Sequence, residues 1–243
     1  YKVYGELINT YGYNLEPGSK ELTALNYYTN EEITIPLDPT QTPGENAQRY
    51  FAKYNKQKRT FEALTELIQE TADDIQYLES ISNALDIALN EADLAQIKEE
   101  LMQSGYIRRK HTKKKVKLTS KPMHYISSDG YDMYVGKNNL QNEELTFSFA
   151  NGNDWWFHAK GAPGSHVIVK SGGDELPDRT FEEAGRLAAY YSKNRGADKV
   201  EIDYIQKKHI KKPNGAKPGF VVYYTNYSLV IDSDISNIKN VQD

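Results

Sequence analysis

The stretch FEALTELIQETADDIQYLESISNALDIALNEA, residues 61–92, decides the architecture of the chain. Its apolar and small residues recur in alternating steps of three and four, which is the heptad pattern of a helix that packs along another helix. The positions of this seam are Phe61, Leu64, Ile68, Thr71, Ile75, Leu78, Ser82, Leu85, Leu89 and Ala92. The pattern predicts a coiled-coil-type helix that begins at Pro43, runs close to Leu101 and occupies the region 43–104.

The outward positions of this helix are acidic, because Lys98 is the only base between Glu62 and Glu100. A helix with one apolar stripe and a charged outer face is not stable alone and needs a partner helix. The sequence holds no second segment of comparable length. We therefore expect the seam to pack against a helix outside this sequence or against a second copy of the chain.

Residues 1–42, before the helix, predict a small cap. The turn signals at Glu16-Pro17-Gly18 and Pro36 border a predicted strand, Glu31–Leu37, in which Ile33 and Ile35 alternate with polar residues. An independently stable domain is not expected here, because a segment of this length buries little apolar surface.

Residues 105–121, after the helix, form a basic linker without a single acid. Its bases are Arg108, Arg109, Lys110, Lys113, Lys114, Lys115, Lys117 and Lys121. The net charge of the chain is only -4. Charge sorted this sharply along a sequence produces local fields that the net value hides, and a basic run indicates a polyanionic partner.

Residues 122–243 predict a compact α+β domain, so the fold class of the whole chain is α+β. A hairpin is expected around Ser128-Asp129-Gly130, and Thr180 to Glu183 has the pattern of a capping box that opens a helix. The other expected elements are a helix at Asn142–Ala150 and strands at Trp155–Lys160, His166–Lys170, Val200–Ile205, Phe220–Thr225 and Tyr227–Ile231.

One predicted strand carries side chains that suit chemistry. Asp154, Trp156 and His158 alternate along it and should share a face, with His166 nearby. A metal site from the carboxylate and the two imidazoles is disfavoured, because no fourth ligand is evident. A hydrolase built on Ser165 is disfavoured as well, because no nucleophile elbow is present. Trp156 and His158 are either core residues or a surface on which unpaired bases stack, and we favour the surface.

A second basic segment, residues 207–219, contains lysines, glycines and prolines but no acid. Such a segment is either a solvated loop or a phosphate-gripping loop, and the second basic run before the same domain favours the grip. Neither it nor Gly136-Lys137-Asn138 matches a P-loop, so an NTPase is not expected. The candidate nucleic-acid-binding residues are Arg108, Arg109, Lys110, Lys113, Lys114, Lys115, Lys137, Asn138, Trp156, His158, His166, Lys207, Lys208, Lys211, Lys212 and Lys217.

The chain contains no cysteine, which removes disulfides, thiolate metal sites and a cysteine nucleophile. No apolar run is long enough to span a membrane, and the first residues lack the order of a signal peptide. We expect a cytoplasmic protein without a cofactor or a membrane partner. The alternative is a location at the cell surface without a recognisable export signal.

Several motifs together resemble the NFACT family, whose members act in ribosome-associated quality control. They are Tyr4-Gly5-Glu6-Leu7-Ile8, Leu37-Asp38-Pro39, Asn46-Ala47-Gln48-Arg49-Tyr50-Phe51, Ser127-Ser128-Asp129-Gly130, Val135-Gly136-Lys137-Asn138-Asn139, Asp154-Trp155-Trp156-Phe157-His158, Pro163-Gly164-Ser165-His166-Val167 and Gly215-Ala216-Lys217-Pro218-Gly219. The resemblance implies a middle domain, the returning coiled-coil helix and a non-catalytic NFACT-R domain, with an outgoing helix as partner of the seam.

The same resemblance implies partners. Bacterial members recruit alanyl-tRNA to the obstructed large ribosomal subunit and support the addition of alanine tails to the stalled nascent chain, while the ribosome performs peptide transfer. Streptococcal members are also known as fibronectin-binding proteins, so an anchorless adhesin that binds fibronectin is the alternative function. The Asp-Arg pair to which the family owes tRNA discrimination belongs to a domain outside this sequence.

Overall fold

The computed structural model describes residues 1–108 and 120–241 of the 243-residue chain. Helices and antiparallel sheets are both present, which confirms the α+β class. The chain forms two compact units, Tyr1–Asp73 and Asp74–Asp243, and each has its own apolar core.

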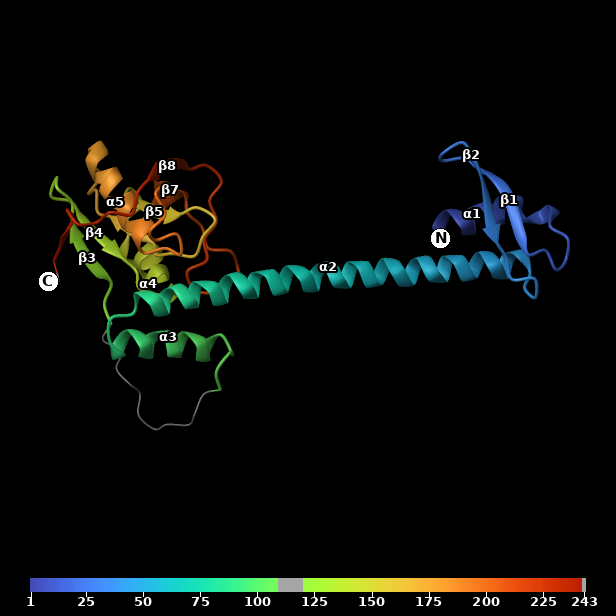
Figure 1. The fold of residues 1–243 in the computed structure, drawn as a ribbon, viewed down its shortest axis with the longest axis horizontal. Helices are drawn as coiled ribbons and strands as arrows, with labels where there is room; N and C mark the ends of the chain where they lie inside the picture. The colour runs from blue at the N-terminus through green and yellow to red at the C-terminus, as the bar shows by residue number, and fades with distance from the viewer. Residues whose placement is uncertain (109–119, 242–243) are drawn as a thin grey trace. The chain divides into compact units, whose positions relative to one another are not determined.

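The first unit joins a helix, a two-stranded hairpin and the start of the long helix (Figure 1). Its elements are α1 at Lys2–Tyr11, a 3-10 turn at Gly12–Asn14, β1 at Glu21–Asn26, β2 at Glu31–Pro36 and the first part of α2. The strand predicted at Glu31–Leu37 is confirmed, whereas α1 was not predicted. Gly5 allows α1 to approach α2, because a Cβ there would lie 2.8 Å from the ring of Phe51. Leu7, Leu22, Ile35 and Tyr50 bring α1, β1, β2 and α2 into one core.

The long helix α2 spans Pro43–Ile87 and does not reach Leu101, so the prediction of one continuous helix is wrong at its end. A second helix, α3 at Glu91–Gln103, follows and lies beside the last turns of α2 (Figure 1). Asn90 separates the two, since its side-chain oxygen accepts hydrogen bonds from the N–H groups of Ala92 and Asp93 and caps α3.

The reversal gives α2 a partner for part of its seam. Tyr77, Ile81 and Ala84 pack against Ile97 and Leu101 of α3. The earlier part of the seam stays exposed within the described residues, with Phe61 at 70%, Leu64 at 51% and Ile68 at 67%. The partner that the heptad pattern predicts for this part stays a prediction.

The second unit is built on a seven-stranded antiparallel sheet of order β8-β7-β5-β6-β4-β3-β9. The strands are β3 at Met123–Ile126, β4 at Asp132–Val135, β5 at Trp155–Ala159, β6 at Val167–Val169, β7 at Val200–Gln206, β8 at Tyr227–Ile231 and β9 at Lys239–Asn240. The remaining elements are α4 at Asn139–Glu144, a π-helical turn at Leu145–Phe149, α5 at Asp178–Tyr190 and a 3-10 turn at Lys207–His209. The predicted hairpin is confirmed as β3–β4, with Gly130 at φ 87 in its turn.

The two faces of the sheet bury different residues. On one face Phe157 and Ile202 pack against Leu187 and Ala188 of α5. On the other face Trp156 joins Ile168 and Ile205 in a separate cluster. Neighbouring positions of β5 therefore face opposite cores, as alternation along a strand requires.

The capping box predicted at Thr180 is wrong, because α5 begins at Asp178 after Pro177 and has no side-chain cap. The two residues of the motif bind the β3–β4 turn instead. Thr180 donates to the carboxylate of Asp129 at 2.8 Å, and the Ser128 N–H donates to Glu183 at 2.8 Å. The motif therefore fastens α5 to the hairpin.

The strand predicted at Phe220–Thr225 is also wrong. Only the isolated bridge between Val222 and Lys211 forms there. Residues 220–225 contain no glycine or proline, and Val221 and Tyr223 pack on the Trp156 face of the sheet.

Candidate nucleic-acid interface

The basic segment 207–219 leaves the end of β7 and is held in place by backbone hydrogen bonds. The N–H groups of Lys207 and Lys208 donate to the carbonyls of Asp154 and Gly152, both at 2.9 Å. Lys211 then exchanges backbone hydrogen bonds with Val222, and the buried Ile210 anchors the segment in the Trp156 cluster. The segment is thus a fixed part of the domain surface.

The lysines of this segment fall into two groups. Lys208 and Lys211 are exposed and Lys207 is half-buried, and among the described residues none of the three side chains has an ion pair. Lys212 lies 2.6 Å from Glu143. Lys217 is also paired, with Asp74.

The ammonium of Lys217 lies 2.5 Å from Asp74 and 4.4 Å from the centre of the Tyr77 ring. The Tyr106 hydroxyl also bonds to both Lys217 and Asp74. These contacts fasten the loop to α2, and they raise the pKa of Lys217 despite its partial burial. Lys217 is therefore primarily a structural residue in this arrangement.

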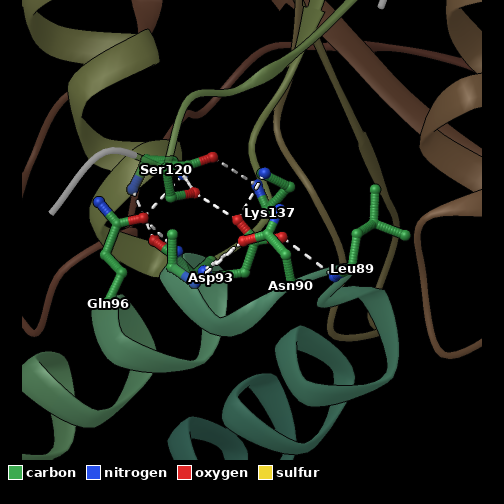
Figure 2. Close-up of polar contacts among 9 residues, drawn as sticks. Leu89, Asn90, Asp93, Gln96, Ser120 and Lys137 are labelled. Atoms are coloured by element: carbon green, nitrogen blue, oxygen red, sulfur yellow. Dashed lines mark hydrogen bonds and ion pairs between the residues drawn. The ribbon is translucent and has the colours of Figure 1, made fainter. Parts of the chain in front are cut away.

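Lys137 and Asn138 were predicted to contact nucleic acid, and the structure contradicts their availability. Both are almost fully buried between α3 and the sheet domain. The Lys137 ammonium lies 2.6 Å from Asp93, whose carboxylate also accepts hydrogen bonds from Ser120 and from the Leu89 N–H (Figure 2). The Asn138 side chain caps α4 and donates to Gln96 at 2.7 Å. The two residues therefore anchor α3 to the sheet domain.

Trp156 was predicted to present an open stacking surface, and this prediction is wrong because the residue is 0% exposed. It does share a face with His158, as predicted, with ring centres 5.5 Å apart. His166 lies nearby, also as predicted, 5.1 Å from Trp156 and 5.4 Å from His158. The Trp156 and His158 rings are stacked, His166 is edge-on to both, and the half-buried Tyr223 lies 5.3 Å from Trp156.

The imidazoles of His158 and His166 are uncharged at neutral pH. Burial lowers the pKa of His158 to about 4, and burial together with the neighbouring His158 lowers the pKa of His166 as well. His166 is held by the Thr146 hydroxyl at 2.7 Å. Neither histidine offers a cation to a phosphate.

Asp154 is separately engaged, since it pairs with Lys170 and accepts hydrogen bonds from the N–H groups of Asn151 and Ser171. Within residues 1–108 and 120–241, no group of three or more histidines or acids is placed to hold a metal ion.

The tryptophan that remains accessible is Trp155, which was not among the predicted site residues. It is half-buried and lies on the α5 face beside Phe181, Tyr204 and Tyr227. Alternation along the strand shows that the two tryptophans face opposite ways, but it does not show which face is covered.

Of the first basic run, Arg108 is exposed. The other predicted residues of the run, Arg109, Lys110, Lys113, Lys114 and Lys115, lie outside the described residues.

The model of the NFACT N-terminal and middle domains matches residues 1–120, and that of the NFACT protein RNA binding domain matches residues 121–224. A solved structure, the C-terminal of the fibronectin/fibrinogen-binding protein from Streptococcus suis, is 37% identical with a TM-score of 0.73, and covers 97% of this chain and 83% of that one. The chain belongs to the NFACT family.

Among the NFACT relatives are curated proteins named Rqc2 homolog RqcH. That of Streptococcus pneumoniae serotype 2 is 44% identical over 239 residues, and that of Bacillus subtilis is 40% identical over 245 residues. Each match covers 98% of this chain but only 43% and 42% of the relative. The chain thus spans less than half the length of these relatives.

The RNA-binding model of the NFACT family begins directly before β3 and contains the whole segment 207–219. The described part of this NFACT chain has no helix that is long and apolar enough to cross a membrane.

Proposed function

We propose that this chain is the RNA-holding part of a ribosome-associated quality control factor. It binds tRNA and the large ribosomal subunit in the cytoplasm, and it supports alanine tailing of a stalled nascent chain. Alanyl-tRNA is the proposed substrate carrier, and peptide transfer is the chemistry of the ribosome.

The observation that carries the proposal is the group Lys207, Lys208 and Lys211, whose side chains lack an ion pair among the described residues. They lie on a segment fixed by backbone hydrogen bonds, within the range matched by an RNA-binding family model. Lysines on a fixed backbone bind phosphates at defined positions, and phosphate contacts set the register of a nucleic acid on a protein.

The proposal assigns no catalytic step and no cofactor to the chain. Ser165 is buried, and the neighbouring His166 is uncharged and bonded to Thr146. Adjacent residues of an extended chain also point apart, so Ser165 and His166 do not form a nucleophile and base.

The test is a gel-shift titration of the 243-residue chain with tRNA, followed by co-sedimentation with large ribosomal subunits. The variant with Lys207, Lys208 and Lys211 replaced by alanine should bind both weakly. A variant at Lys212, whose charge is already paired with Glu143, is the matched control and should bind nearly as well as the unchanged chain. Equal binding by the triple variant would refute this grip.

A second candidate function is fibronectin binding, favoured by the name of the Streptococcus suis protein. Binding of immobilised fibronectin by the chain, undiminished by an excess of tRNA, would support this role beside RNA binding. Retention of fibronectin only through the basic segment would indicate a nonspecific ionic contact.

A further inference from the structure

A ladder of aromatic rings crosses three strands of the second unit and ends at the edge of the sheet. Phe157, Tyr204 and Tyr227 are direct partners in the register of β5, β7 and β8. The Phe157 and Tyr204 rings are stacked with centres 5.5 Å apart and planes at 15°, and Tyr204 and Tyr227 repeat this at 5.5 Å and 26°.

Exposure increases along the ladder. Phe157 is 0% exposed, Tyr204 is half-buried, and Tyr227 is 63% exposed on the last strand of the sheet order. Trp155 flanks the outer rungs, with its ring centre 5.8 Å from Tyr204 and 6.3 Å from Tyr227. The ladder therefore ends at the exposed ring of Tyr227, which stacks on Tyr204.

The register places the start of the basic segment at the end of the sheet where Tyr227 begins β8, while Ile210 anchors the segment on the opposite face, with Trp156. Gln206 is the partner of Trp155, so Lys207 and Lys208 follow directly at the same end of the sheet. Their side chains have no ion pair in the part of the chain that the structure describes. The negative charge of Asp178 near the ladder disfavours a phosphate there. The pKa of Tyr204 is raised first by burial, then by Tyr227 and then by Asp178.

We propose that Tyr227, flanked by Trp155, is a stacking platform for an unpaired base of single-stranded RNA, whose phosphates lie on Lys207 and Lys208. The inference rests on the proposed RNA-binding function and specifies its ligand as unpaired nucleotides. Every base has a flat π-face, so an aromatic ring next to cations binds single strands with little regard to sequence.

A peptide strand that pairs with the open edge of β8 is the competing occupant, because an unpaired edge can add a strand. Lys207 and Lys208, at the same end of the sheet, favour the polyanion, because strand addition does not need cations there. Strand addition is therefore an outcome of the test.

The experiment uses the 243-residue chain, a single-stranded RNA oligonucleotide and a blunt RNA duplex of the same length. Tyr227→Leu keeps an apolar contact with Tyr204 but removes the flat ring, and it should weaken single-strand binding by about 5-fold to 100-fold. Duplex binding and the salt dependence should stay unchanged. Tyr227→Phe should restore single-strand affinity, because the ring alone stacks.

Tyr224→Leu is the matched control, because Tyr224 is 86% exposed and has no ring contact among the described residues. It should bind both RNAs as the unchanged chain does. Single-strand affinity unchanged in Tyr227→Leu would overturn the platform and leave the edge open to a peptide. An equal loss for both RNAs would also overturn it.

The lysine variants decide the proposed function separately. If the Lys207, Lys208 and Lys211 triple variant weakens both RNAs while Tyr227→Leu changes neither, RNA binding stands and the platform is refuted. If the triple variant binds both RNAs normally, the proposed grip fails whatever happens at Tyr227.

Discussion

The ammonium of Lys137 lies 2.6 Å from a carboxylate oxygen of Asp93, and both side chains are almost fully buried between α3 and the sheet domain. The pair joins residues that are 44 positions apart in the sequence. It is part of a polar network that includes Ser120, Gln141 and Gln96. This contact explains why the motif Gly136-Lys137-Asn138 carries a lysine without serving as a phosphate loop.

Removing one member of this pair should be strongly destabilising. Lys137→Met leaves the Asp93 carboxylate buried without its counter-charge, and breaking a buried pair in this way costs about 3 to 5 kcal/mol. Urea unfolding measures the change. Lys193→Met is the control, because its pair with Glu79 is exposed on both sides and should contribute about 1 kcal/mol or less. Equal losses in the two variants would contradict the structural role of Lys137.

Glu100 provides a pH-dependent prediction with the opposite sign from an ordinary carboxylate. Burial raises its pKa, although hydrogen bonds from Asn139 and Tyr77 work against the rise. The protonated form is therefore favoured in the folded state, and its contribution to stability is lost as the pH rises through the folded pKa. Glu100→Gln should stabilise the protein at neutral pH and flatten this dependence. Glu70→Gln, on the exposed part of α2, should do neither.

His158 should make the stability of the folded protein decrease in acid. Its folded pKa of about 4 lies below its ordinary value because of burial, so the unfolded chain binds the proton first. Its contribution is fully present above about pH 6.5 and is lost as the pH falls from there to about 4. Unfolding measured at several pH values should show that His158→Gln loses less stability over this range than the unchanged chain. Parallel curves for the two proteins would show that His158 is not the group responsible.

The exposed seam of α2 should mediate association. Leu64, Ile68 and Ile75 are 51%, 67% and 55% exposed in the described structure, and an apolar stripe of this kind rarely stays bare in water. Sedimentation velocity should show self-association of the isolated chain, which replacement of these three residues by glutamine abolishes. Leu89→Gln is the control, because Leu89 is 73% exposed but lies beyond the end of α2. A strict monomer with intact helix would contradict the prediction.

The sequence predicted periodic features well and tertiary ones poorly. The heptad seam predicted α2 because periodicity is a local property, but the same spacing continues through Leu89 and Ala92 after the helix has ended. The signal that marks the end is Asn90 followed by acids in the next turn, a pattern typical of a helix start.

The candidate site shows the same limit. Trp155 and Trp156 are equivalent in a linear pattern, and only the packing of α5 on one face and of Ile210 and Tyr223 on the other decides which one is accessible. Lys137 is likewise indistinguishable from a phosphate-binding lysine until Asp93 is placed beside it. The basic segment 207–219 could be recognised as a candidate from its acid-free composition with glycines and prolines, because such a pattern is local in the sequence.

The salt dependence of RNA binding measures how many phosphates the basic segment neutralises. For single-stranded RNA the logarithm of the binding constant should fall linearly with the logarithm of the salt concentration, and each lost phosphate contact should reduce the slope by about 0.7. Replacing Lys207, Lys208 and Lys211 by alanine should therefore reduce it by about 2 if all three contact phosphates. Replacing Lys212 and Lys217 should change the slope less, because Glu143 and Asp74 already balance their charges. The reverse order, with the larger loss at Lys212 and Lys217, would show that RNA displaces both acids and that the paired lysines form the grip.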